Sequence, residues 1–232
     1  MSAIATTPLH RAVGFYAAPV GKKAVMAVTG VILVAYVIGH LLGNLQIFAA
    51  DPDQINRYAA FLHNPANAAA LWAVRAFLVA AVVLHIIAAV QLWLQNRAAR
   101  PVGYYKKDDV PTAYAARTMV WSGPIIAAFV VFHILHLTTG SVLPLTDING
   151  NPNTPDVRAN IIAGFQNPAI AGFYIFAMIL LCMHLYHGLW SMFQSVGFVR
   201  ATRIKTAAAV AAILIAIGFC SIPVCVLIGV LR

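Results

Sequence analysis

Five long apolar stretches divide the chain, at residues 24–48, 69–95, 119–143, 169–196 and 206–231. About 20 apolar residues are enough for a helix to cross the roughly 30 Å hydrocarbon core of a bilayer. The pattern therefore predicts an all-α integral membrane protein, with five transmembrane helices in a bundle that forms a single membrane domain over residues 1–232. The connection 144–167 contains three prolines, so we expect it to lie outside the membrane, with room for a short surface helix.

Lysine and arginine gather in alternate connections and predict the orientation of the helices. Only Arg57, Arg75, Arg158 and Arg232 fall on one side. The other eleven are Arg11, Lys22, Lys23, Arg97, Arg100, Lys106, Lys107, Arg117, Arg200, Arg203 and Lys205. Because cytoplasmic connections carry the excess of basic residues, we expect the N-terminus in the cytoplasm and the C-terminus outside.

Composition supports the membrane assignment and narrows the function classes. Of the 232 residues, 62% are hydrophobic and 9% charged, with a net charge of +9. The basic residues follow the topology pattern and suit anionic phospholipid, so we do not expect nucleic-acid binding. The first 19 residues lack a cleavable signal peptide, so the first helix is expected to act as its own insertion signal.

The three cysteines, Cys182, Cys220 and Cys225, all lie in apolar stretches. This position predicts buried thiols rather than disulfides. The chain has no Cys-x-x-Cys-His motif for covalent haem attachment and no set of thiolates for an iron–sulfur cluster.

Six of the eight histidines lie inside the predicted spans: His40, His85, His133, His136, His184 and His187. An imidazole in hydrocarbon needs a hydrogen-bond partner or a metal, so each is a candidate functional residue. For any single histidine, a hydrogen bond across a helix interface is the ordinary alternative. The distribution over the first four helices favours a shared role.

The depths of these histidines match in pairs. His40 lies 17 residues after Lys23, and His133 lies 16 residues after Arg117, which places both about 25 Å from the inner boundary at 1.5 Å per residue. On the helices that run the other way, His85 lies 12 residues before Arg97, or about 18 Å from that boundary. Depth alone leaves both His184 and His187 as its partner.

Two imidazoles that face each other at one height suit the axial positions of a haem, since the porphyrin fills the other four. Two such pairs predict two non-covalent haem b groups between the first four helices, an arrangement that carries electrons across the bilayer. A metal site without haem is not expected, because no carboxylate or thiolate side chain clusters with these histidines at their depth in the membrane.

The local sequences around these histidines resemble a known family, the single-subunit, five-helix, di-haem cytochrome b anchors of succinate:quinone oxidoreductases. The matching stretches, in order, are Met26-Ala27-Val28-Thr29-Gly30, His40-Leu41-Leu42-Gly43-Asn44, Asn56-Arg57-Tyr58-Ala59, Phe61-Leu62, Asn96-Arg97-Ala98-Ala99-Arg100-Pro101, Trp121-Ser122-Gly123, His133-Ile134-Leu135-His136 and His184-Leu185-Tyr186-His187-Gly188-Leu189-Trp190. The resemblance spans nearly the whole chain.

The resemblance implies a ligand for each haem iron. It assigns His40 and His133 to the haem distal to the cytoplasm, and His85 and His184 to the proximal haem. His184 is preferred over His187 because the family has a glycine four residues after this histidine, here Gly188. His136 and His187 then become candidates to support the ligands or to contact haem propionates. Arg75 is a candidate partner for a distal propionate, with snorkelling as its alternative.

The resemblance also implies partners. The chain would be the membrane subunit of a succinate dehydrogenase in the bacterial cytoplasmic membrane, without a dicarboxylate site of its own. A flavoprotein subunit with FAD and an iron–sulfur subunit would dock on the cytoplasmic side, where Lys22, Lys23, Lys106 and Lys107 lie. Electrons would pass through the haems to quinone, and menaquinone is the expected quinone. A higher oligomer of the complex is compatible with the resemblance.

The chain departs from the family in its acidic residues. Some members move protons through glutamates, whereas all six acids here are aspartates and the position two before His184 is Cys182. Asp51 and Asp53 are then the nearest candidates for proton exchange on the outer side. The alternatives are a cytochrome b of a fumarate reductase, hydrogenase or formate dehydrogenase, and a transporter with a histidine relay. The transporter predicts internal repeats that the sequence does not show.

Overall fold

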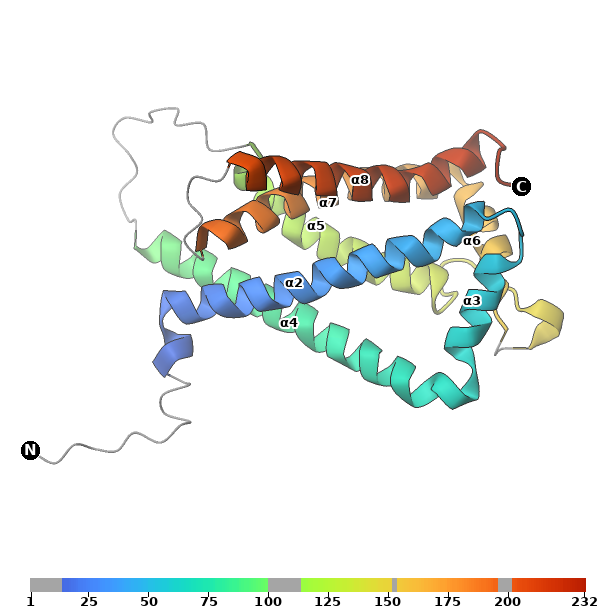
Figure 1. The fold of residues 1–232 in the computed structure, drawn as a ribbon, viewed down its shortest axis with the longest axis horizontal. Coiled ribbons are helices and arrows are strands. Elements are labelled where there is room, and N and C mark those ends of the chain that lie inside the picture. The colour runs from blue at the N-terminus through green and yellow to red at the C-terminus, as the bar shows by residue number, and fades with distance from the viewer. Residues whose placement is uncertain (1–13, 100–113, 152–153, 196–201) are drawn as a thin grey trace, which may run out of the picture. The chain divides into compact units, whose positions relative to one another are not determined.

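The computed structural model describes residues 14–99, 114–151, 154–195 and 202–232, and these residues form helices joined by short connections (Figure 1). The α-helices are α2 (Pro19–Asn44), α3 (Gln54–His63), α4 (Ala68–Ala98), α5 (Tyr114–Leu137), α6 (Val157–Phe165), α7 (Pro168–Ser195) and α8 (Thr202–Leu227). Three short 3-10 turns accompany them: η1 (Leu45–Phe48), η2 (Pro65–Asn67) and η3 (Ile148–Gly150).

The five predicted spans are confirmed as helices, because α2, α4, α5, α7 and α8 are each long and apolar enough to cross a membrane. Large apolar side chains point outward along them. Trp72 is 66% exposed, Trp121 73% and Leu214 62%. A water-soluble protein would bury such residues, whereas lipid solvates them at no cost. The chain is therefore a multi-pass, all-α membrane protein.

Two of the spans end earlier than predicted. The third prediction ran to residue 143, but α5 ends at Leu137, where Gly140 adopts a φ of +68° and the Ser141 N–H donates to the Leu135 carbonyl at 2.8 Å. The fifth ran to residue 231, but α8 ends at Leu227, followed by Gly229 with a φ of +75°. Glycine reaches this left-handed conformation without strain and so terminates helices, and the sequence contains this information in its glycine positions.

The connection between the first two spans contains a helix that the sequence analysis missed. The sequence pattern predicts no helix between residues 48 and 69, whereas α3 occupies Gln54–His63. Ile55 and Ala59 are buried on one face of α3, which is the spacing of an amphipathic surface helix. The expected short helix in 144–167 is confirmed as α6, and Asp156 caps it by accepting a hydrogen bond from the Ala159 N–H at 3.0 Å.

The chain divides into two compact units, which are described separately. The first comprises residues 1–36 and 74–109, and the second residues 37–73 and 110–232. In the first unit, two side-chain contacts link α4 to α2 and to the residues before it: the Tyr16 hydroxyl donates to Gln91 Oε1 at 2.9 Å, and Thr29 lies beside His85.

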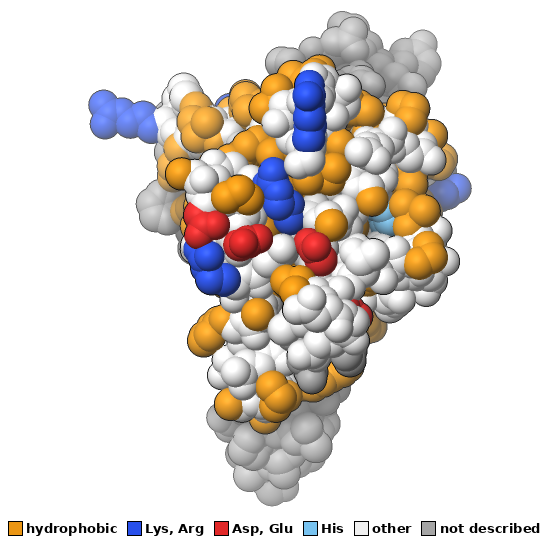
Figure 2. Space-filling view, turned by 90° about the vertical axis from the view of Figure 1, so that its right-hand side faces the viewer, with side chains coloured by type: hydrophobic (Ala, Val, Ile, Leu, Met, Phe, Trp, Pro, Cys, Tyr) orange, Lys and Arg blue, Asp and Glu red, His pale blue; other side chains and the backbone are white. Residues whose placement is uncertain are grey.

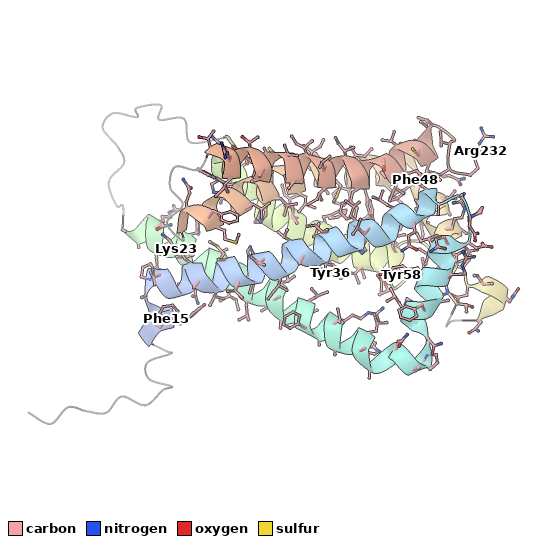
Figure 3. All side chains as sticks on the ribbon, viewed as in Figure 1. Phe15, Lys23, Tyr36, Phe48, Tyr58 and Arg232 are labelled. Atoms are coloured by element: carbon pink, nitrogen blue, oxygen red, sulfur yellow. The ribbon has the colours of Figure 1, made fainter. Side chains whose placement is uncertain are left out.

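The second unit has its core between α5, α6, α7 and α8. α7 packs against α8 and α5, and α6 lies against all three. Asn167 caps the start of α7 and Pro168 occupies its first position, an arrangement typical of helix N-termini. Phe129, Phe165, Tyr174 and Ile222 are among the residues that fill the core. The same unit includes α3, whose Tyr58 ring lies against Gly43 at the end of α2 (Figure 3).

A polar network ties α3, α6 and the C-terminal residues together. The Asn56 side chain is 6% exposed, donates to Asp156 Oδ1 at 3.0 Å and accepts from the Arg158 N–H at 3.0 Å. The Arg158 guanidinium donates to the backbone oxygens of Ile47 and Arg232. Figure 2 shows acidic and basic side chains gathered on this face of the molecule. The network explains why a buried asparagine is tolerated there.

We expect Asn56→Ala to destabilise this end of the protein. The change removes two buried hydrogen bonds and leaves an Arg158 N–H without its acceptor, which costs about 1–3 kcal/mol. Thermal unfolding in detergent should show a clearly lower midpoint. Asn67→Ala is the matched control, because its bond to the Phe61 carbonyl is exposed, and its midpoint should stay close to that of the original protein. Equal midpoints for Asn56→Ala and Asn67→Ala would contradict this account.

Candidate functional site

His40 of α2 and His133 of α5 lie side by side in the second unit. Their ring centroids are 5.6 Å apart, with the rings edge to face at 85°. Phe219 lies 5.9 Å from His40, and Phe129, one helical turn before His133, lies 6.0 Å from it. An imidazole nitrogen binds a metal at about 2 Å, so two axial nitrogens lie about 4 Å apart. The ring centroids would then lie about 6 Å apart, since each lies about 1 Å behind its nitrogen. The observed 5.6 Å is close to that spacing, but the edge-to-face contact means that a ring must rotate to aim both nitrogens at one point.

Tyr174 of α7 joins His133 to His136. Its hydroxyl lies 3.2 Å from His133 Nδ1 and 2.9 Å from His136 Nδ1. The two histidines are three positions apart on α5 and so face α7 together. Tyr174 is 7% exposed, and the rings of Phe129 and Phe165 enclose it at centroid distances of 4.9 and 4.8 Å. One buried hydroxyl therefore orients two imidazoles.

His136 is packed on both of its nitrogen-bearing edges. It is 1% exposed, and its Nε2 has no hydrogen-bond partner among the described residues. Nε2 faces Gly164 of α6, where a Cβ would lie 2.6 Å away. Any side chain at position 164 would collide with the ring, and the gap leaves no space for an iron about 2 Å from the nitrogen. His136 therefore lacks the space to bind an iron through Nε2, although it lies on the same face of α5 as His133.

His85 of α4 lies beside Thr29 of α2 in the first unit. Their Nδ1 and Oγ1 atoms are 3.0 Å apart. The single hydroxyl proton of Thr29 is already donated to the Val25 carbonyl at 2.7 Å. With its proton on that carbonyl, Thr29 accepts a hydrogen bond from His85, so Nδ1 carries the imidazole hydrogen and Nε2 is the unprotonated nitrogen. That is the form in which a neutral imidazole binds a metal through Nε2.

The other predicted histidines lie on α7 in the second unit. His184 approaches Gly123 of α5, where a Cβ would stand 3.9 Å from its Cε1 atom. His187 is half-buried. The structure thus brings His40 to His133 and His133 to His136, groups His85 with Thr29, and places His184 against Gly123. Arg75 is half-buried in α4.

The basic residues expected to face a soluble partner differ from one another. Lys22 is 6% exposed and donates to the carbonyls of Tyr16 and Ala17 at 3.2 and 2.7 Å. Its charge is used within the chain, so the prediction that it contacts a partner is not supported, whereas Lys23 is exposed. Arg11, Arg100, Lys106, Lys107 and Arg200 lie outside the described residues.

Asp51, predicted to exchange protons on the outer side, forms an exposed ion pair with Arg57. The hydrogen bond from Arg57, and then that from the Asp53 N–H, lower the pKa of the Asp51 carboxyl below its usual range. The carboxyl therefore stays ionised at neutral pH, which makes it a weak proton acceptor there. Asp53 is also exposed.

Within the described ranges, no three His, Cys, Asp or Glu side chains come together as a metal site. A bare ion such as zinc takes about four protein or water ligands. Three of the histidines, His85, His133 and His136, instead lie within hydrogen-bond distance of a Thr29 or Tyr174 hydroxyl. We found no match to this chain among protein-family models, curated proteins or solved structures.

Sequence reasoning missed the two hydroxyl partners, Thr29 and Tyr174. Thr29 belongs to a stretch that carries the family resemblance, but its contact with His85 joins positions 56 residues apart. Tyr174 has one usable indication, because a tyrosine within an apolar span needs a partner for its hydroxyl. Neither partner can be assigned without the packing of the helices.

Proposed function

We propose that this chain is the di-haem cytochrome b membrane subunit of a succinate:quinone oxidoreductase, located in the bacterial cytoplasmic membrane. In this proposal it passes electrons from an iron–sulfur partner to quinone, with menaquinone as the expected acceptor. The observation that carries the proposal is the close pair of His40 and His133 inside the membrane helices, with Tyr174 bonded to His133. The family resemblance supplies the partner proteins.

The donor set fits haem better than any other metal group. Axial ligation needs two neutral imidazoles and no third donor, because the macrocycle supplies the remaining four. His40 and His133 are such a pair, and they lie beside Phe129 and Phe219 in an apolar region. The contact of His85 Nδ1 with Thr29 favours a proton on Nδ1, which would make Nε2 the ligand atom. We assign His85 and His184 to the proximal haem on the basis of sequence.

A haem with two histidine ligands supplies one-electron transfer and has no open position for oxygen. The residues of this chain perform the remaining tasks. His40 and His133 hold one group on two helices, and Tyr174 and Thr29 orient the rings of His133 and His85. The aromatic side chains around His133 exclude water. Lys23 stays available on the predicted cytoplasmic side, where we propose that the iron–sulfur and flavoprotein subunits dock.

The test is haem quantitation on the purified protein, together with a reduced-minus-oxidised optical spectrum. We expect two haem b per chain, released by acidic organic solvent because they are not covalently attached. Succinate should reduce them in membranes that contain the whole complex, and added quinone should reoxidise them. A chain without haem, or with one, would contradict the di-haem proposal. Haems that formate or hydrogen reduce, but succinate does not, would assign the subunit to another quinone-linked complex.

A further inference from the structure

Tyr174 occupies a position that the ligand assignment leaves unexplained, because its hydroxyl lies between two imidazoles inside the membrane. We propose that Tyr174 is the positioning residue of the distal haem: it holds the proton of His133 on Nδ1 and lowers the reduction potential of that haem. This inference rests on the proposed function and extends it to a residue outside the ligand set.

Counting protons shows what Tyr174 does. A hydroxyl has one hydrogen to donate and lone pairs that accept, so it cannot donate to both Nδ1 atoms. If His133 binds iron through Nε2, its proton is on Nδ1 and is donated to the Tyr174 oxygen. Tyr174 then donates its own hydrogen to His136 Nδ1. The chain of bonds runs from His133 through Tyr174 to His136, whose own proton then lies on Nε2 and has no acceptor among the described residues.

The distances agree with this direction. Bonds donated by a hydroxyl are generally shorter than bonds donated by N–H. The Tyr174–His136 distance of 2.9 Å is shorter than the Tyr174–His133 distance of 3.2 Å. This order matches a bond donated by the hydroxyl to His136 and a bond donated by His133 to the hydroxyl oxygen.

Packing holds Tyr174 in this position. Its ring lies within the core of the second unit, between Phe129 and Phe165. His136 is held in turn by its close approach to Gly164. Because these contacts fix both the hydroxyl and its acceptor, the orientation of His133 is set before any cofactor binds. Supporting residues of this kind normally fix the ring and tautomer of a metal-binding histidine.

The electronic consequence has a definite sign. An imidazole that donates its N–H to an acceptor becomes more electron-rich and a stronger ligand. A more basic axial ligand favours the oxidised iron and lowers the reduction potential. Removal of the Tyr174 oxygen should therefore raise the potential of the haem between His40 and His133. The haem at His85 depends on Thr29 and should keep its potential.

The experiment is a redox titration of the Tyr174→Phe variant in the purified complex, followed by optical and electron paramagnetic resonance spectra of each haem. We expect two haems per chain, with the potential of one raised and the other unchanged. Tyr58→Phe is the matched control: the same hydroxyl is lost from α3, where the ring lies against Gly43 rather than a histidine. Both potentials should stay at their original values in this control.

A second form of the test keeps the packing intact. Incorporation of 3-fluorotyrosine at Tyr174 makes the hydroxyl a weaker acceptor, so the same haem should shift upward by less than in Tyr174→Phe. An unchanged potential in both forms would overturn the role of Tyr174, as would equal shifts in both haems or in the Tyr58→Phe control. An original protein without haem would instead overturn the proposed function, so the two failures are distinct.

Discussion

Replacement of His133 by alanine is expected to remove one haem from each chain and leave the other in place. His133 lies 5.6 Å from His40 and is the histidine of α5 whose Nε2 is left open when Nδ1 bonds to Tyr174. In the proposed function, this change would leave His40 as the one remaining protein ligand of that haem, so binding of that haem should fall below detection after purification. Haem quantitation should drop from two per chain to one.

His136 provides the control for this experiment because it lies on the same face of α5. We expect His136→Ala to retain both haems, since Gly164 blocks its Nε2 and Tyr174 occupies its Nδ1. His40→Ala should reproduce the loss seen with His133→Ala and affect the same haem in the spectrum. If His136→Ala lost a haem while His133→Ala kept both, the ligand on α5 would be His136 and the argument from Tyr174 would reverse.

The sequence was sufficient to predict the five spans because membrane insertion depends on apolar length, which is a local property. It was also sufficient to place His40 and His133 at one height, since a helix converts residue count into depth at a fixed rise. α5 and α8 each end just before a glycine with positive φ. The apolar run continues past this glycine, so hydropathy alone does not detect the end of the helix. Hydropathy therefore placed the C-terminal ends of both helices too late in the sequence.

The parts of the site that were not predicted depend on contacts between distant segments. Tyr174 meets His133 across 41 residues of sequence, and Asn56 meets Asp156 across 100. Gly164 matters only because His136 faces it from another helix. Such contacts follow from how helices pack, and one sequence carries no direct record of that packing. Depth could not choose between His184 and His187 for the same reason, since it fixes height but not the facing direction.

The second large effect concerns His85 and His184, for which we expect alanine substitutions to remove the same haem. In the proposed function, their similar depth in the sequence and the family resemblance place both on one iron, and the contact with Thr29 keeps the His85 proton on Nδ1. Each variant should retain one haem per chain, with the optical and paramagnetic signature of the His40–His133 group. The double variant should retain the same single haem, because the second change removes nothing further.

His187→Ala decides the choice that depth left open. His187 lies three positions after His184, close to one turn of α7. If His184 is the ligand, His187→Ala keeps two haems and His184→Ala keeps one. The reverse result would assign the iron to His187 and leave the di-haem proposal intact. Loss of different haems in His85→Ala and His184→Ala would break the pairing itself, because two ligands of one iron cannot lose separate groups. The spectra of these single variants therefore test the ligand assignment independently of enzymatic activity.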